Sequence, residues 1–242
     1  MAKVRDQHLG AIQGQVGPQV FKILNGDSYV AQLPHRSNVE PSDAVKERRK
    51  QFGLTMKFAK AIYMLLMLRL FWKSFIPDGA KKAMTTMSKI AKASYPCVTA
   101  TEITDIALLE PDFGFAVTTT TKTLANDEFT VVTAALGDTG IIDTTKETTV
   151  YLLCVAHLSE PTSNTYSANR FFSLKSAGQI LSTSTALTFT IPLDSAMGQV
   201  YDAYATKKAF FVLVTTDSNG APVHFSSTFH TCLLYTSDAA DE

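Results

Sequence analysis

The feature that most constrains the fold is the run of short β-type segments that fills the chain after Cys97. In this part Thr, Val, Phe and Tyr dominate, and segments such as Leu187–Ile191 alternate apolar and polar residues. Such alternation is typical of strands that bury one face. Turn-forming stretches at 137–140, 160–164 and 217–220 separate the segments. The predicted strands are Phe113–Thr123, Glu128–Ala135, Thr148–Leu158, Asn169–Leu174, Ala186–Pro192, Ala209–Thr216 and Val223–Phe229.

Seven short strands at fairly regular spacing predict an antiparallel, immunoglobulin-like β-sandwich over residues 97–231. We expect Phe171, Phe189, Phe210 and Phe211 in its core, because aromatic side chains bury large areas. The chain lacks the Cys, Trp and Cys pattern of antibody domains, so the prediction concerns the general architecture alone.

The preceding region has a helical pattern. From the N-cap candidate Ser42 to about Phe75, apolar residues recur at three- and four-residue steps, and basic residues fall largely on other faces. Pro77 ends this helix, and Ala80–Ser94 predicts a shorter basic helix, which together indicate a helical hairpin. Ile62–Trp72 is apolar almost all round. We therefore expect other elements or another copy to cover it, with its Met residues in a core rather than in a binding groove.

A β hairpin is predicted near the start of the chain. The apolar runs Val20–Leu24 and Tyr29–Leu33 flank Asn25-Gly26, which is a good signal for a tight turn. The glycines before this hairpin have neither the spacing nor the strand-to-helix context of a dinucleotide-binding loop. The expected fold class is therefore α+β, with a basic hairpin-plus-helical region at 1–96 followed by the sandwich at 97–231.

The last eleven residues, 232–242, resemble the translation of a transposase-type sequencing adapter, as met at the ends of genes predicted from metagenomes. The match implies that the natural sequence is cut near Thr231, and the alternative is a natural polar tail. We therefore leave this segment out of the fold prediction. The natural cysteines are then Cys97 and Cys154, which lack CxxC spacing, so no zinc or redox site is predicted. A disulfide between them stays open, although a chain without a signal peptide favours free thiols.

The net charge of zero hides a strong asymmetry. Residues 1–96 contain 16 Lys and Arg against 6 Asp and Glu, whereas residues 97–231 contain 6 against 13. This asymmetry indicates an anionic partner for the first part, or attraction between the two parts or between copies. The simpler interpretation is a solvated basic helix beside an acidic β domain.

Six cations on the first predicted helix are the best candidates for an anion-binding site. Clustered positive charge is sufficient to contact phosphates, so a nucleic-acid backbone is one candidate partner. An anionic membrane surface or the acidic β domain of a neighbouring subunit would suit the same charge. No recognised motif for reading bases is present. The residues are Lys46, Arg48, Arg49, Lys50, Lys57 and Lys60.

No common catalytic or cofactor motif occurs, including GxSxG, HExxH and the P-loop, so catalytic, cofactor and metal residues stay unassigned. His224 and His230 could share a strand face, but zinc needs three or four ligands. The acidic residues within 105–112 lack the alternating ligands of a known calcium loop, so a solvated loop is the simpler interpretation. His157 follows an apolar strand and is expected at an edge or in a loop.

Several short motifs resemble an uncharacterised family of bacterial proteins, found mostly in gut-type genomes, that carries a domain of unknown function. Its members have an MAK start, a GxxGKVG motif, a β segment ending near Leu-Pro and a helix with an RxxF element. The counterparts here are Met1-Ala2-Lys3, Gly14-Gln15-Val16-Gly17, Leu33-Pro34 and Arg49-Lys50-Gln51-Phe52.

The second half fits the same family, with an apolar strand like Val150–Val155, a strand ending in Pro like Leu187–Pro192, and Ala209–Thr216 before a DxxG turn. The sequence departs from the family at Gln15, where Lys is usual, and at Ala31-Gln32, where Arg is common, which weakens any argument from a basic hairpin. The resemblance covers most of residues 1–230. It implies architecture alone, because the family has no assigned activity.

These observations predict a non-catalytic structural or protein-interaction protein that self-associates. The alternative is a nucleic-acid-binding protein that uses its basic helices, and an enzyme would require polar side chains that converge in a deep pocket. The sequence shows no secretory signal and no apolar run long enough to span a bilayer, so a cytoplasmic location is expected.

Overall fold

The structure is a computed structural model that describes residues 2–3, 14–16, 19–24, 27–32, 40–80, 82–104, 108–110 and 113–234. The chain forms two compact units, Met1–Asp43 and Ala44–Glu242. The boundary falls at the first residue of the long helix, and not at Pro96 where the composition changes. The helical region therefore belongs to the same unit as the sandwich.

The first unit contains a small antiparallel sheet with the strand order β1-β4-β3-β2. Its centre is the hairpin of β3 and β4, whose pairing runs from Gln19↔Gln32 to Leu24↔Asp27. This pairing confirms the hairpin predicted around Asn25-Gly26, although the turn itself lies outside the described residues. The strands are β1 (Ala2–Lys3), β2 (Gly14–Val16), β3 (Gln19–Leu24) and β4 (Asp27–Gln32).

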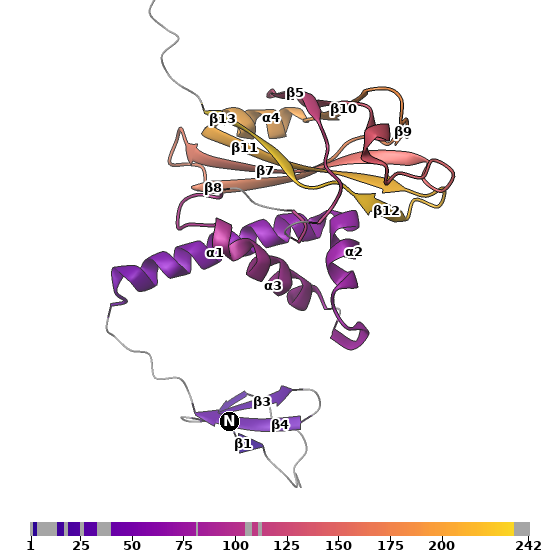
Figure 1. Ribbon diagram of the computed structural model, residues 1–242. Helices are drawn as coiled ribbons and strands as arrows, with labels where there is room; N and C mark the ends of the chain where they lie inside the picture. The colour runs from indigo at the N-terminus through magenta and orange to yellow at the C-terminus, as the bar shows by residue number, and fades with distance from the viewer. Residues whose placement is uncertain are drawn as a thin grey trace, which may run out of the picture. The chain divides into compact units, whose positions relative to one another are not determined.

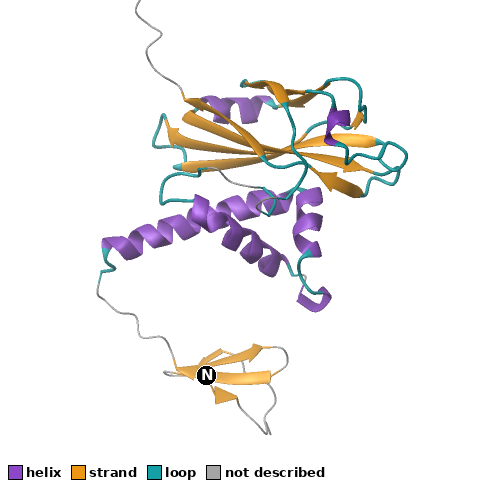
Figure 2. Cartoon of the chain, in the orientation of Figure 1, coloured by secondary structure: helices purple, strands orange, loops and turns teal. Residues whose placement is uncertain are grey.

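The second unit has three layers, with helices on one face of a six-stranded sheet and a three-stranded sheet on the other face (Figures 1 and 2). The α+β class and the β-sandwich are thus as predicted. The helices are α1 (Asp43–Met64), α2 (Leu66–Ser74), η1 (Asp78–Ala80), α3 (Ala83–Ser94), η2 (Tyr95–Cys97), η3 (Leu136–Thr139) and α4 (Ser195–Asp202). The strands are β5 (Thr119–Leu124), β6 (Glu128–Thr133), β7 (Thr149–Pro161), β8 (Asn169–Lys175), β9 (Gln179–Ile180), β10 (Leu187–Pro192), β11 (Tyr204–Thr216), β12 (Pro222–Phe225) and β13 (Phe229–Leu234).

All the pairings between these strands are antiparallel. The larger sheet has the order β12-β11-β7-β8, with β13 also paired to β11 and β9 to β7. The smaller sheet has the order β10-β6-β5. An immunoglobulin-like arrangement of these strands stays a prediction.

The two long central strands, β7 and β11, are buried on both faces. On β7, Leu153 and Val155 lie in a core shared with the helices, whereas Leu152 and Cys154 lie in the core between the sheets. We call these the helix-side core and the sandwich core. In strands covered on both sides nearly every residue is apolar, because neither set of alternate side chains faces water.

Neighbouring phenylalanines on β11 separate in the same way. Phe210 packs into the helix-side core, and Phe211 packs into the sandwich core together with Phe189. Phe171 is only partly buried and packs against the helix-side core. The four phenylalanines expected in one core are thus divided between two.

The helix-side core also contains the apolar stretch that the sequence marked as needing cover. Phe58, Ile62, Leu68 and Trp72 have no exposed surface. The Trp72 indole nitrogen donates a 3.0 Å hydrogen bond to the carbonyl of Leu108, which satisfies its one polar group. Elements of the same chain therefore provide the cover for these side chains.

The helical layer differs in detail from the predicted hairpin. The first helix is interrupted at Leu65, whose backbone is extended, and it continues as the separate helix α2. The interruption lies inside an apolar stretch without Pro or Gly, so the sequence carries no local signal for it.

The predictions after residue 190 also need corrections. The segment predicted as one strand at Val223–Phe229 is two strands, β12 and β13, and the second runs to Leu234, past the end of the predicted sandwich at Thr231. The short helix α4 was not predicted, although Asp194 accepts a hydrogen bond from the backbone nitrogen of Met197 as an N-cap.

Candidate functional site

A cleft of about 750 Å³ lies between helix α1 and one end of the larger sheet. We call it the α1 cleft. Helix α1 contributes one wall, residues 100–102 another, and the ends of β7, β8 and β11 form the floor. The lining residues are Lys50, Gly53, Leu54, Lys57, Ala100, Thr101, Glu102, Ser159, Glu160, Pro161, Ala168, Asn169 and Thr206.

The strand register explains why the floor is polar. Ser159 of β7 pairs with Asn169 on one side and with Thr206 on the other, so the three side chains form a row across the sheet. Further along the same face the residues are apolar, as with Val155 and Phe210. The sheet therefore changes from apolar to polar under the middle of α1.

Glu160 continues this polar end in an unusual conformation. Its φ is 59°, in the left-handed region that residues other than Gly rarely adopt. The Oγ1 hydroxyl of Thr206 donates a 2.6 Å hydrogen bond to Oε2 of Glu160 and fixes its carboxylate at the cleft. Backbone strain of this kind costs roughly 1–3 kcal/mol and is found preferentially at functional sites.

His157 lies behind the floor rather than at an edge or in a loop, which corrects the expectation from sequence. It is 1% exposed, and its ring stacks on Phe171 at 4.8 Å. Its Nε2 lies 2.7 Å from Oδ1 of Asn169, whereas its buried Nδ1 has no hydrogen-bond partner in the part of the chain that the structure describes. Burial lowers the pKa of His157. The ring is therefore held neutral, with its proton on Nε2 directed at Asn169.

Two of the six predicted anion-binding residues, Lys50 and Lys57, line the cleft. Gly53 lies between them on α1, and no heavy atom lies within 4 Å of the position that a Cβ would take there. Neither lysine has an ion pair with any described residue. This wall thus combines open space with two uncompensated ammonium groups.

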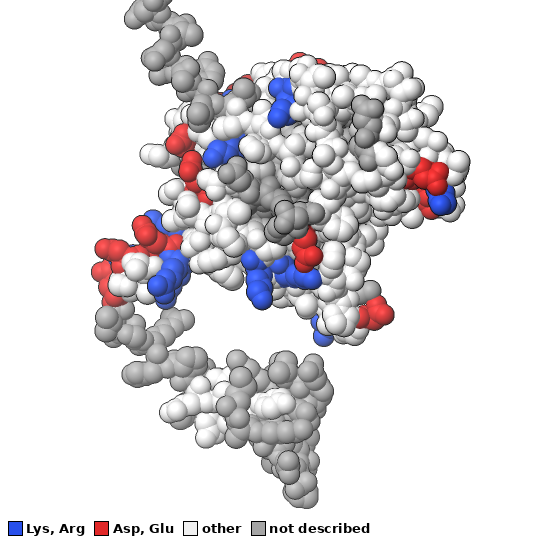
Figure 3. Space-filling model, in the orientation of Figure 1, with Lys and Arg blue, Asp and Glu red and all other residues white. Residues whose placement is uncertain are grey.

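The other four predicted cations do not line the cleft. Arg48, Arg49 and Lys60 are exposed elsewhere on α1, and Lys46 is half-buried. Figure 3 shows charges of both signs over the helical layer and over the visible part of the sandwich. The structure therefore divides the predicted basic patch into a cleft pair and a dispersed remainder.

The acidic groups at the cleft already have partners. Lys208 lies 3.5 Å from Glu102 and donates a 3.2 Å hydrogen bond to the carbonyl of Ile103. Glu160 is held by Thr206, as described above. The hydroxyl of Thr206 is neutral, so Glu160 keeps its negative charge and offsets one of the two lysines of the α1 wall, which leaves one net positive charge for a ligand.

A second hollow of about 360 Å³ lies between α1 and α3. We call it the α1–α3 groove. Phe52 and Met84 at its rim are 58% and 64% exposed, although both are large apolar side chains. Its lining is mostly apolar, with Lys92 as its one charged residue, and consists of Phe52, Thr55, Met56, Met84, Ser88, Ala91, Lys92, Tyr95 and Pro96. A surface of this composition is typical of sites that bind apolar groups.

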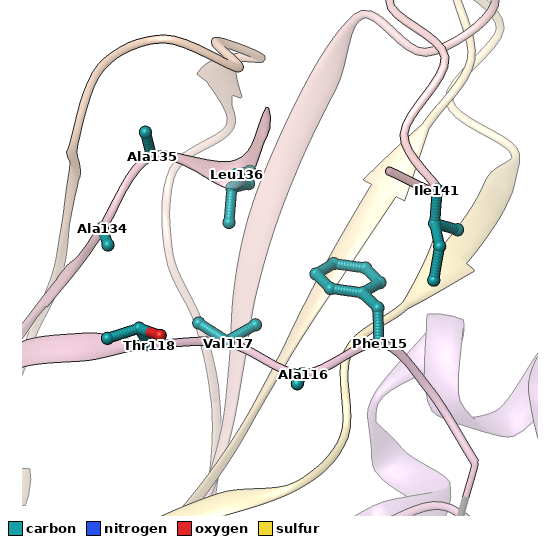
Figure 4. Close-up of a pocket in the computed structure, with 8 residues that line it drawn as sticks. All are labelled: Phe115, Ala116, Val117, Thr118, Ala134, Ala135, Leu136 and Ile141. Atoms are coloured by element: carbon teal, nitrogen blue, oxygen red, sulfur yellow. The ribbon is translucent and has the colours of Figure 1, made fainter. Parts of the chain in front are cut away.

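A third hollow of about 330 Å³ lies where the chain enters β5, next to η3 (Figure 4). The side chains drawn there are apolar apart from the hydroxyl of Thr118, and none can ionise. This hollow therefore offers no chemistry beyond apolar contact.

The remaining candidates from the sequence do not form sites. Nδ1 of His224 contacts Oε1 of the buried Glu147 at 3.0 Å, so this histidine joins a structural contact and not a pair with His230. Among the described residues, no three His, Cys, Asp or Glu side chains form a group that could hold a metal ion. Glu110 lies 3.5 Å from Lys89, and Asp105 and Asp112 lie outside the described residues.

Cys97 and Cys154 are both free thiols, which settles the disulfide that the sequence left open. Burial raises the pKa of Cys154, so its thiol stays protonated and inert. The described part of the cleft presents ammonium, hydroxyl and amide donors, a combination that binds a ligand through hydrogen bonds and charge. Sequence reasoning missed Gly53, Ser159, Asn169 and Thr206, since strand register and cavity shape bring them together.

None of the described helices combines the length with the apolar character that a bilayer crossing requires. Neither a scan of protein-family models nor a search of curated proteins finds a match to this chain.

Proposed function

We propose that the chain is a non-catalytic structural protein that associates with further copies of itself, with the α1–α3 groove as the receiving surface. The observation that carries the proposal is the exposure of Phe52 and Met84 at the rim of an apolar hollow. Exposed apolar groups beside a groove gain free energy when a partner covers them, by about 25 cal/mol for each Å² buried.

The charge distribution supports another copy as the occupant. The first 96 residues carry an excess of Lys and Arg, and residues 97–231 carry an excess of Asp and Glu. A groove set against the same groove would bring like charges together, whereas a groove set against the sandwich of another copy brings opposite charges together.

The sandwich also offers an apolar side chain to fill the groove. Ile180 of β9 is 86% exposed, the highest value among the large apolar side chains that the structure describes. A contact between Ile180 of one copy and the groove of the next joins two different surfaces. Such head-to-tail contacts build rings or open filaments, which suits a structural role.

Sedimentation velocity tests this proposal at up to about 100 μM, where a contact with a micromolar Kd is well populated. We expect the wild-type chain to form oligomers that weaken at high salt, because opposite charges attract across the contact. Phe52→Asp and Ile180→Asp should each give monomers, and Val223→Asp is the matched control on the sandwich surface.

The decisive sample is an equimolar mixture of Phe52→Asp and Ile180→Asp. Each variant retains one intact surface, so the mixture should form dimers and nothing larger. A wild-type chain that stays monomeric at the highest concentration contradicts the proposal, and so does a mixture that stays monomeric.

A further inference from the structure

We infer that the α1 cleft binds a small anionic metabolite, a phosphate ester or carboxylate that also carries hydroxyl groups. The cleft is separate from the groove used in the proposed association. Its volume of about 750 Å³ lies within the range of about 300–1,000 Å³ that is usual for small-molecule sites.

Gly53 is the first argument for a ligand. Gly in the interior of a helix lowers stability relative to Ala. Nothing in the structure requires it, because its backbone is not in the left-handed region and a Cβ would meet no heavy atom within 4 Å. What the missing side chain does provide is free space in the cleft wall between Lys50 and Lys57.

The charge of the cleft specifies an anion. Lys50 and Lys57 have no ion pair among the described residues, and Glu102 is matched by Lys208. The carboxylate of Glu160 offsets one of the two lysines, so the cleft keeps one net positive charge. An anion seated over Gly53 would lie between the two ammonium groups. Hydrogen bonds that involve a charged group are stronger than those between neutral groups, so the two lysines favour an anion over a neutral ligand.

The floor supplies further donors and one acceptor. The Asn169 oxygen is occupied by His157, which leaves the Asn169 amide nitrogen to donate into the cleft. The hydroxyl of Ser159 has no partner among the described residues. Glu160 retains Oε1 as an acceptor, since Thr206 occupies Oε2. A hydroxyl group on the ligand would satisfy that acceptor.

The cleft geometry favours a small molecule over a nucleic acid. Arg48, Arg49 and Lys60, which a long polyanion would need, lie outside the cleft. A polyanion bound along α1 would depend on these residues as strongly as on Lys50 and Lys57, because its affinity follows the number of phosphates neutralised.

Isothermal titration calorimetry on the full chain tests the inference with glucose 6-phosphate, citrate and uncharged glucose. We expect saturable binding of at least one of the two anions and no binding of glucose. The anion that binds identifies the class of ligand.

Two variants then locate the site. The double substitution Lys50→Gln with Lys57→Gln should weaken binding about tenfold or more, since it removes two charged donors. Gly53→Leu should do the same by filling the cleft, and leucine suits a helix interior, so the fold is expected to persist. Lys60→Gln is the matched control and should bind as the wild type does.

Three results would overturn the inference. One is the absence of saturable binding by both anions. Another is an equal loss of affinity in Lys60→Gln, which would indicate unspecific charge attraction. The third is a single-stranded oligonucleotide that binds more tightly than either anion and loses affinity in Arg49→Gln, which would assign the cations to a nucleic acid.

Discussion

The two faces of the larger sheet are covered in different ways. On one face the three-stranded sheet closes an apolar core that includes Phe129, Phe189 and Phe211, all without exposed surface. On the other face, helices cover an equally apolar middle but leave the α1 cleft at one end and the α1–α3 groove on the outside. The α1 cleft and the α1–α3 groove, the two receiving surfaces proposed above, are therefore on the helical side.

The difference follows from shape. Two sheets pack with their inner side chains interdigitated over the whole shared area. A helix is a cylinder, so it contacts a flat sheet along a stripe and diverges from it on both sides of that stripe. Where the sheet below is polar, as at Ser159 and Thr206, no apolar contact closes the space. The sandwich face of the larger sheet is therefore closely packed, whereas the helical face keeps open space.

The largest expected effect tests whether both faces belong to one cooperative fold. Phe58→Ala removes a helix-side ring that contacts Phe171 and Phe210, each at 6.0 Å, and Phe211→Ala removes a sandwich-side ring. Each should lower the free energy of unfolding by about 3–5 kcal/mol, because a buried aromatic side chain is replaced by a cavity. Urea unfolding measures both changes.

The chain contains one tryptophan, Trp72, which lies in the helical layer, so its fluorescence reports on that layer. Far-ultraviolet circular dichroism reports on the secondary structure of the whole chain. We expect the two signals to change together in both variants. A fluorescence transition in Phe58→Ala that precedes the dichroism transition would show that the helices unfold as a domain of their own.

A smaller effect concerns the buried His157 of the helical face. Burial lowers its pKa, and the charge of Lys208 acts in the same direction, while Asn169 and Glu102 oppose them. The unfolded chain therefore binds more protons than the folded state as the pH falls below the ordinary histidine value of 6.5. We expect the free energy of unfolding to be greatest above this pH and to decrease as the pH falls below it.

His157→Gln should remove part of this decrease, since glutamine does not titrate and can still donate to Asn169. The exposed His230 provides the matched control, and His230→Gln should keep the wild-type slope. Urea unfolding between about pH 7.5 and pH 5.5 covers the window in which histidine titrates and carboxylates stay charged. An unchanged dependence on pH in His157→Gln would mean that the ring takes up a proton in the folded state as readily as in the unfolded chain.

The smallest expected effect has the opposite sign. Gly53→Ala should raise the free energy of unfolding by about 1 kcal/mol, because alanine is the better helix former and its Cβ meets no neighbour. The urea concentration at the midpoint of unfolding checks this value, provided that the dependence of the free energy on urea (the m-value) is the same in both proteins. A lower free energy of unfolding would show that a neighbour or the backbone needs glycine at position 53. The space beside Gly53 would then not be open, which would weaken the contrast between the helical face and the sandwich face of the sheet.

Much of the strand pattern could be predicted because it depends on local alternation. Leu187–Pro192 alternates buried and exposed residues along its whole length, and its predicted strand is confirmed almost to the residue. β11 was predicted from Ala209, although it begins at Tyr204. Its first residues include Lys207 and Lys208, which look like a loop in sequence but pair with β7 and β13 in the sheet.

The candidate site could be predicted only in part. Clustered charge on a helical segment marked Lys50 and Lys57, but it marked four other cations equally. The residues opposite them come from three strands, of which β11 is far from β7 and β8 in sequence, and only the register that aligns Ser159 with Asn169 and Thr206 makes them neighbours. A long-range arrangement of this kind has no local signal in one sequence.

Because β11 is buried on both faces, burial of apolar residues alone does not fix the register in which it pairs with its neighbours. Slippage of a strand by one residue normally exposes its apolar face to water, and this penalty suppresses the error. Here Phe210 and Phe211 are equally apolar, so slippage in the middle of the strand would exchange one buried phenylalanine for another. The polar end supplies a penalty, because the same slippage would remove Thr206 from the row that it forms with Ser159 and would break its hydrogen bond to Glu160. Thr206, which lines the cleft, thus also helps to fix the alignment of β11.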